Sequence, residues 1–361
     1  MKKLFFAAHS LDIGGIETAL VTLINRLSSE EKYDITLALE LKQGIFLNDI
    51  SPKVKIIEYK PSENKFMPLR KMINLGKRIK FIAKYKNKFD FSASFATYSL
   101  SSGFMARTAS GNCALWVHAD YLSLNHGDKQ KTKGFFENVL HTKYKHIVFV
   151  SNEARNSYLS IFPAQEGSTI VCNNVIDYEK IRAKSLEKID LKKDTRVTTF
   201  LNVGRHDERQ KKLTRLIEAS KRLKEDGFNF RVLMIGEGKE TEFYKNLVKD
   251  ASLENQILFL GKQKNPYPYF KISDCAILTS DYEGYPVVFV EAFVLGLPII
   301  TTNVSDAKEE IEGKFGYVTE KETEDIYNHM KKFLQEGYMI NKRFDCEEFN
   351  KKQIDTLKKI L

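Results

Sequence analysis

Two stretches in the second half of the chain carry residues suited to holding an anion. The first, residues 203–212, places Gly204 and Arg205 after an apolar run and Lys211 at the start of a helix-like pattern. Arg offers a planar fork of donors and Lys a movable point charge, so the two could hold one diphosphate from two sides. A solvated charged loop is the alternative, but cations at a helix N-terminus oppose the helix dipole, which favours a functional role.

The second stretch holds two glutamates, Glu283 and Glu291, separated by an apolar run. Pro286 suits a first helical turn, which puts Glu283 in a loop and Glu291 inside a helix. Eight residues at ~100° each leave the two carboxylates about 80° apart, so each could meet a different part of one ligand. A carboxylate in so apolar a run is poorly explained as plain core. The backbone N–H groups that would face an anion here belong to Gly284, Tyr285 and Val287.

Weaker signals stand in the turns of both halves. Gly14 and Gly15 follow the first apolar run, and paired glycines there let a backbone approach a ligand, although the turn could be merely geometric. His118 closes another strand-like run, while Asn174 and Gly236 stand in turns. For these three residues a structural role and a ligand-binding role both remain open.

The elements that must position these residues alternate between strand-like and helix-like patterns, which predicts an α/β protein with parallel sheets covered on both faces. Helical patterns include 17–27, 211–225 and 287–295. Residues 177–196 are charged and poor in large apolar side chains, so they predict a boundary between domains 1–176 and 177–345. A C-terminal helix at 346–361 is a candidate to pack back on the first domain. The expected strands are 4–8, 35–39, 54–57, 91–95, 114–117, 147–150 and 169–172, then 197–203, 230–235, 257–260, 276–278 and 298–301.

Composition excludes several classes of protein. The 361 residues are 42% hydrophobic, which argues against disorder, and contain no apolar run near the ~20 residues that cross a bilayer. The four cysteines and seven histidines show no metal-ligand spacing, so we expect a reduced cytoplasmic protein without a metal site. The net charge of +10 favours an anionic partner, but no nucleic-acid-binding module is recognisable, so no nucleic acid is expected.

One segment, from Lys65 to Lys88, is basic without any acidic residue. Apolar residues recur at helical spacing within it: Met72, Leu75, Ile79 and Ile82. Two interpretations stay open: a helix packed on the core with a solvated basic face, and a helix that docks on an anionic membrane surface.

Taken together, these loops resemble the retaining glycosyltransferases of family 4. Glu283 and Glu291 match that family's paired-glutamate motif in its Glu-Gly-Tyr-Pro setting, preceded by the Gly-Arg…Lys loop. The Gly14-Gly15-x-Glu17 and Trp116-x-His118-x-Asp120 segments fit as well. The resemblance covers essentially the whole chain and implies a GT-B fold, two facing Rossmann-like domains with a cleft between them.

The resemblance also implies roles. Arg205 and Lys211 would hold the nucleotide diphosphate, Glu283 the donor sugar hydroxyls and Glu291 the ribose hydroxyls, while His118 would line the reaction centre. The remaining donor-binding candidates are Gly14, Gly15, Asn174, Gly204, Gly236, Gly284, Tyr285, Pro286 and Val287. The family's lysine usually lies five residues after the arginine and is followed by Gly. Position 210 is Gln here, so we assume a one-residue insertion and give the diphosphate-binding role to Lys211. Lys212 is the alternative.

The implied activity is retaining transfer of a hexose from a nucleotide-diphosphate sugar to a glycan or lipid-linked glycan acceptor, as in bacterial surface polysaccharide biosynthesis. No cofactor is expected, since two cations could replace a metal ion at the leaving group. A nicotinamide dehydrogenase lacks support because no Gly-x-Gly-x-x-Gly follows the first strand. A GT-B-fold partner protein that binds nucleotide sugar or glycan without turnover remains the alternative.

Overall fold

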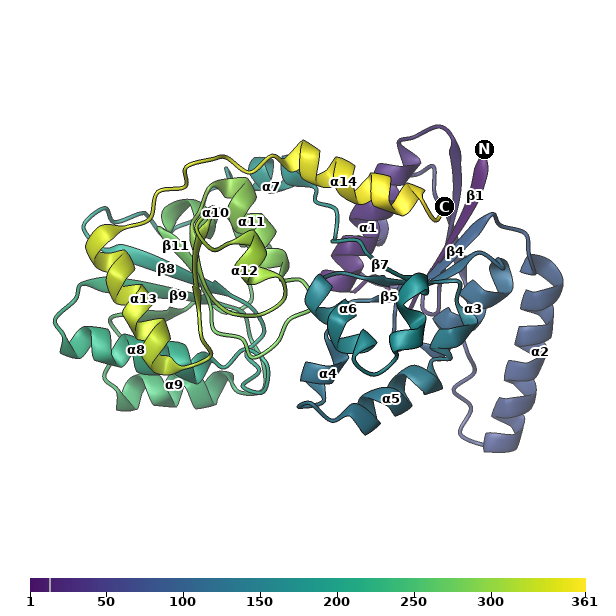
Figure 1. Ribbon diagram of the computed structural model, residues 1–361, viewed down its shortest axis with the longest axis horizontal. Helices are drawn as coiled ribbons and strands as arrows, with labels where there is room; N and C mark the ends of the chain where they lie inside the picture. Colours follow the sequence, from purple (N-terminus) through teal and green to yellow (C-terminus); the bar gives the residue numbers. More distant parts are fainter. Residues whose placement is uncertain (13) are drawn as a thin grey trace. The chain divides into compact units, whose positions relative to one another are not determined.

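The computed structural model describes residues 1–12 and 14–361, and its chain divides into two compact units. Unit 1 comprises Met1–Ile176 and Glu347–Leu361, and unit 2 comprises Asp177–Cys346. Each unit is an open parallel sheet with helices on both faces (Figure 1). Among the described residues, no helix is both long and apolar enough to cross a membrane.

Unit 1 is built on the first sheet, which has the strand order β3-β2-β1-β4-β5-β6-β7 and is parallel throughout. The strands are β1 (Lys2–Ala8), β2 (Tyr33–Leu39), β3 (Lys55–Glu58), β4 (Phe91–Ser94), β5 (Cys113–Val117), β6 (His146–Phe149) and β7 (Thr169–Val171). The helices are α1 (Gly15–Ser28), α2 (Met67–Tyr85), α3 (Leu100–Ala109), α4 (Tyr121–Leu124), α5 (Lys129–Asn138), α6 (Asn152–Leu159) and α14 (Cys346–Lys358). Short 3-10 turns cover Ile45–Asp49, His141–Lys143 and Pro163–Ser168.

Unit 2 is built on the second sheet, with the parallel order β10-β9-β8-β11-β12-β13. In Figure 1, α8, α9 and α13 cover one face of it and α10, α11 and α12 the other. The strands are β8 (Thr198–Val203), β9 (Phe230–Ile235), β10 (Ile257–Phe259), β11 (Cys275–Leu278), β12 (Ile299–Thr302) and β13 (Gly316–Thr319). The helices are α7 (Tyr178–Lys184), α8 (Leu213–Glu225), α9 (Thr241–Asp250), α10 (Tyr267–Ile272), α11 (Val287–Leu295), α12 (Ala307–Glu310) and α13 (Thr323–Glu336).

The predicted class, two parallel-sheet α/β domains, is confirmed, and the predicted strands lie within a few residues of the observed ones. Strand β13 was missed, because four residues that begin with Gly316 give no strand-like apolar run. The predicted helix 211–225 was wrong at its start: α8 begins at Leu213, and both Lys211 and Lys212 precede it.

Helix α2 lies on α3, at the outside of unit 1 (Figure 1). Its buried side chain is Phe81, which contacts the rings of Tyr59 and Phe104. The predicted apolar row points to solvent instead, with exposed fractions of 65% for Met72, 59% for Leu75, 58% for Ile79 and 38% for Ile82. The core-packed interpretation of this row is therefore wrong.

The C-terminal helix α14 packs on unit 1. Asn350 accepts a hydrogen bond from Ile176 N at 2.9 Å and donates to Ile176 O at 2.8 Å. Asn173 N donates to Gln353 Oε1 at 2.9 Å. These contacts tie α14 to the last residues of unit 1 before the chain enters unit 2.

Candidate functional site

The carboxyl edge of the second sheet gathers the charged residues that the sequence singled out. Gly204 and Arg205 follow β8, Gly236 follows β9 and Glu283 follows β11. Strand β8 pairs in parallel with both β9 and β11, so all three strands end at the same edge. Ligands of open α/β sheets bind at such an edge.

Hydrogen bonds to backbone carbonyl groups join the loop after β8 to the loop after β11. Asp281 N donates to Gln210 O at 2.8 Å, and Thr279 Oγ1 donates to Lys211 O at 2.9 Å. Arg215 of α8 forms an ion pair with Asp281 at 2.6 Å. The two motifs, about 70 residues apart in sequence, thus form one structure.

Lys211 and Glu283 form the centre of this structure. Lys211 Nζ lies 2.6 Å from Glu283 Oε1, and the side chains are only 17% and 10% exposed. Glu283 also accepts hydrogen bonds from Ser280 Oγ at 2.7 Å and Gln210 Nε2 at 3.2 Å. Lys211 packs along Gly204, where a methyl group would lie 3.2 Å from its Cε. A mostly buried cation and carboxylate therefore sit side by side, each available to a different part of one ligand.

Lys212, the alternative lysine, has a different environment. Its backbone is left-handed, with φ at +49°, and it is the N-cap of α8. This backbone region favours glycine, which is the residue that the resembled family has after its lysine. The ammonium of Lys212 lies 3.7 Å from Glu208 and 3.9 Å from Asp281. The contact with Glu283 belongs to Lys211.

Arg205 and the glycines complete this edge. The Arg205 side chain is exposed and reaches Gln210 Oε1 at 3.5 Å, so its guanidinium is open to a ligand. Gly236 has φ at +138°, and a methyl group on it would lie 1.8 Å from Gly204 O. The observed reason for glycine at position 236 is therefore the close approach of two backbone loops.

Glu291 lies inside α11, as predicted, and is buried. Burial raises the pKa of its carboxyl to about 7, partly offset by a hydrogen bond with the Tyr267 side chain of α10. The pKa of Tyr267 is raised by burial and by Glu291. Sequence analysis missed Tyr267, because no motif connects it to a residue 24 positions away.

In the turn before α11, backbone groups rather than side chains are available to a ligand. Tyr285 is buried, and its hydroxyl donates to Glu310 at 2.9 Å. Ser305 Oγ donates to Gly284 O at 2.8 Å. Pro286 is the N-cap of α11 rather than a residue of its first turn, and Val287 begins the helix. The N–H groups at the start of α11 lie at the strand edge that also carries Glu283.

In unit 1, Gly14 is the N-cap of α1 and Gly15 its first residue. The Glu17 carboxylate folds back over this turn, since a methyl group on Gly14 would lie 2.1 Å from Glu17 Oε2. Burial, helped by Asp12, raises the pKa of Glu17. The N-terminus of α1 therefore already faces a carboxylate, which disfavours a second anion there.

His118 lies just beyond β5, as expected, with its ring 4.6 Å from that of Phe95. Burial lowers the pKa of His118 to about 3, so its imidazole is neutral, and its buried Nε2 has no hydrogen-bond partner among the described residues. Asn174 lies in the coil between β7 and α7. Unit 2 thus brings Arg205, Lys211 and Glu283 together, whereas His118, Asn174 and the Gly14–Gly15 turn belong to unit 1.

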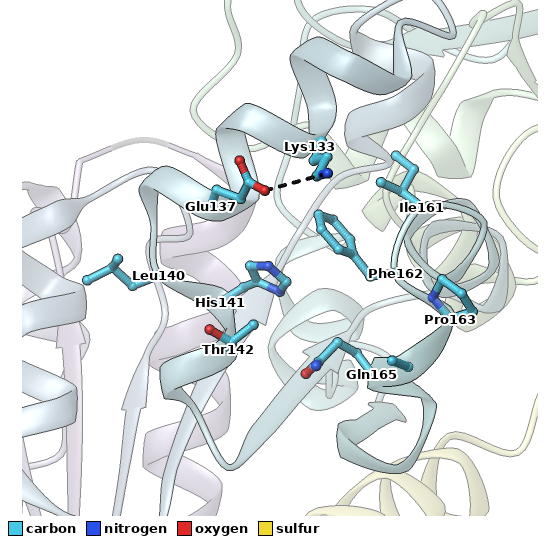
Figure 2. Close-up of a pocket in the computed structure, with 10 residues that line it drawn as sticks. Lys133, Glu137, Leu140, His141, Thr142, Ile161, Phe162, Pro163 and Gln165 are labelled. Atoms are coloured by element: carbon cyan, nitrogen blue, oxygen red, sulfur yellow. Dashed lines mark ion pairs between the residues drawn. The ribbon is translucent and has the colours of Figure 1, made fainter.

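Elsewhere among the described residues, metal-binding clusters and hollows offer no better site. No group of three potential metal-binding side chains occurs in the described part of the chain. A hollow of about 500 Å³ lies between α5, α6 and the turns that follow them, and Figure 2 shows His141 and Phe162 in its wall. Its Lys133 lies 3.9 Å from Glu137, and His141 Nδ1 lies 2.6 Å from the Tyr158 hydroxyl. Because His141 precedes β6, this hollow lies toward the amino end of that strand, where ligands of such sheets do not usually bind.

Comparison with known proteins finds similarity to glycosyltransferases. Residues 183–353 match the family "Glycosyl transferases group 1". An uncharacterised glycosyltransferase of Methanocaldococcus jannaschii is 31% identical over 175 residues, which are 47% of this chain and 42% of that protein. The N-acetylgalactosamine-N,N'-diacetylbacillosaminyl-diphospho-undecaprenol 4-alpha-N-acetylgalactosaminyltransferase of Campylobacter jejuni is 26% identical over the full length of both chains.

Solved structures show the same architecture. Anabaena HepE in complex with UDP and glucose aligns with a TM-score of 0.75 at 18% identity, over 99% of this chain and 100% of HepE. The apo form of the lipopolysaccharide outer core galactosyltransferase WaaB aligns with a TM-score of 0.70 at 18% identity, over the full length of both chains. Residues 183–353 are therefore similar to the glycosyl transferases group 1 family, and the chain has the parallel-sheet α/β architecture of GT-B glycosyltransferases.

Proposed function

We propose that this protein is a retaining glycosyltransferase that moves a hexose from a nucleotide-diphosphate sugar to a hydroxyl of a glycan or lipid-linked glycan in surface polysaccharide biosynthesis. The observation that carries the proposal is the buried Lys211–Glu283 pair beside the open guanidinium of Arg205. Two relatives support the acceptor class. One, from Campylobacter jejuni, is named as a transferase that acts on a diphospho-undecaprenol-linked glycan, and the other, from Erwinia amylovora, as an amylovoran biosynthesis glycosyltransferase.

In the proposed reaction, Arg205 and Lys211 bind the diphosphate, Glu283 the donor sugar hydroxyls and Glu291 the ribose hydroxyls. The bond from the anomeric carbon to the phosphate oxygen breaks, and its electron pair leaves with the diphosphate. The acceptor oxygen then bonds to that carbon on the same face, and its proton passes to the departing phosphate. The two cations stabilise the growing negative charge, which is the function that a metal ion would otherwise serve.

A thermal-shift screen with uridine, guanosine, adenosine and thymidine diphosphates and their sugars tests the donor class. A binding nucleotide raises the melting temperature by mass action. Hydrolysis of the stabilising nucleotide sugar by the purified chain, or transfer from it, then distinguishes an enzyme from a binding protein. Stabilisation by none of these compounds would contradict the proposal.

We further propose that the protein is cytoplasmic and docks on anionic lipid through α2. The exposed Met72, Leu75 and Ile79 form one row, while Phe81 anchors the opposite face of the helix in unit 1. No acidic residue lies between Glu63 and Asp90, and basic residues near a lipid surface contribute about 1 kcal/mol each. An apolar row with basic flanks is typical of helices that lie in the membrane interface.

Vesicle flotation tests this docking. The wild-type protein should float with phosphatidylglycerol vesicles at low salt, and the variant Met72→Ser/Ile79→Ser should not. Because both side chains are exposed, the variant should keep its melting temperature. Equal flotation of both proteins, or of neither, would contradict the docking surface.

A further inference from the structure

The carboxyl edge of the first sheet carries a polar network that the proposed donor chemistry does not use. His9 follows β1 and Glu40 follows β2, and these strands pair in parallel, so both residues lie at the edge where ligands of such sheets bind. His9 Nδ1 lies 3.5 Å from Glu40 Oε2. The network belongs entirely to unit 1.

Glu40 is fixed from the other side by α3. The hydroxyls of Ser99, the N-cap of α3, and Ser102 both donate to Glu40 Oε1, the latter at 3.2 Å. Glu40 is 8% exposed. Its ion-pair partner among residues 1–12 and 14–361 is His9. A buried carboxylate is costly when hydroxyls and one half-exposed imidazole must compensate it, and a glutamine could accept the same hydrogen bonds without the charge. Packing and hydrogen bonding alone therefore do not explain why a charged glutamate stands at position 40.

The surroundings of His9 suit hydroxyl groups rather than phosphates. Asp12 and Glu17 act electrostatically on one another, and Tyr98 is half exposed beside Glu17 and Glu40. Although the chain carries a net charge of +10, this edge is acidic and would repel a diphosphate. Carboxylates accept hydrogen bonds from hydroxyls, and the exposed Tyr98 ring offers an apolar face.

We propose that His9 hydrogen-bonds a hydroxyl of the sugar acceptor and that Glu40, held by Ser99 and Ser102, positions the imidazole for this contact. The half-exposed His9 ring has Nδ1 directed at Glu40, which leaves Nε2 for the ligand. His9 is then an acceptor-binding residue and Glu40 a positioning residue. This inference rests on the proposed glycosyltransferase function and specifies where a neutral sugar acceptor binds.

The test uses the full chain with octyl glycosides of glucose, galactose, N-acetylglucosamine and N-acetylgalactosamine as acceptor probes. Their binding is followed by the fluorescence of Trp116, the single tryptophan, which lies in β5 next to Phe95. Transfer from the donor identified above gives the acceptor KM, and hydrolysis without acceptor reports on the donor side alone.

His9→Ala should weaken probe binding and raise the acceptor KM at least tenfold, while donor hydrolysis stays within about twofold. Glu40→Gln should raise the acceptor KM in the same direction, and His9→Gln should recover part of the loss. The control is His146→Ala, which removes another partly buried histidine that hydrogen-bonds Asn112 at 3.1 Å but starts β6 at the opposite edge. It should leave the acceptor KM unchanged.

Unchanged probe binding and acceptor KM in both His9→Ala and Glu40→Gln would overturn the proposal. Equal loss of hydrolysis and transfer would also do so, because it indicates a structural role. A wild-type chain that binds none of the four glycosides at millimolar concentration contradicts it as well. A wild-type chain that binds a glycoside through His9 but neither hydrolyses nor transfers a sugar would refute only the proposed function.

Discussion

Replacing Lys211 by methionine is the sharpest test of the donor site, because it removes the charge and keeps the aliphatic stem. Loss of one donor to a developing anion typically lowers turnover by ~100-fold or more. The structure also predicts a stability effect. Breaking a buried ion pair costs about 3–5 kcal/mol, but Glu283 would keep its bonds from Ser280 and Gln210, so we expect about 2–3 kcal/mol.

In unit 2, which has about 170 residues, that loss corresponds to a fall in melting temperature of about 4–12 °C. Turnover is measured by release of nucleoside diphosphate, and stability by calorimetry. Lys212→Met is the matched control: its ammonium lies 3.7 Å or more from its partners and is 31% exposed, so both quantities should change little. Adding Glu283→Gln to Lys211→Met should restore stability but not turnover. Loss of turnover in Lys212→Met with full activity in Lys211→Met would refute the assignment.

Three further outcomes follow from the structure. Burial raises the folded-state pKa of Glu291 from 4.5 to about 7, so the ionised form is disfavoured on folding and stability falls as pH rises from about 4.5 to 7. Glu291→Gln should therefore be more stable than the wild type at pH 8, by up to about 3 kcal/mol, and this difference should vanish near pH 4.5 in urea titrations. Asn350→Ala removes both hydrogen bonds to the Ile176 backbone and should cost about 1–3 kcal/mol, seen as faster amide exchange of Ile176 with unchanged exchange in β8. If Arg205 and Lys211 neutralise the leaving group, EDTA should leave turnover within about twofold, and a complete loss that Mg²⁺ restores would contradict a metal-independent reaction.

The sequence predicted most of the strands because parallel strands buried on both faces are short apolar runs, such as Phe230–Ile235. It missed β13, whose four residues pair with β12 only because the chain returns to that edge. The row Met72, Leu75, Ile79 showed helical periodicity, but periodicity does not tell which face of a helix meets the protein. Phe81, on the opposite side, is the buried residue.

The sequence also predicted the candidate site only in part, because local motifs do not show which residues the fold brings into contact. Motifs singled out Lys211 and Glu283 as candidate site residues, while their 2.6 Å contact depends on the pairing of β8 with β11 and cannot be read from local spacing. Whether Lys211 or Lys212 makes that contact depended on a single backbone conformation, that of the left-handed Lys212 just before α8. Glu40 gave no signal, since a lone carboxylate after a strand is common, and only the fold shows that it is buried between His9 and Ser99.

The two strand edges differ in charge, and from this difference we expect them to bind different ligands. At the second sheet, Arg205 is open to a ligand and Lys211 is held by a carboxylate, so an arriving diphosphate finds one free cation and one already oriented. At the first sheet, Glu17 covers the Gly14 turn and Glu40 is buried nearby, so the same diphosphate would meet repulsion. We therefore expect nucleotide affinity to depend on unit 2 and the hydroxyl-bearing acceptor to be recognised by unit 1.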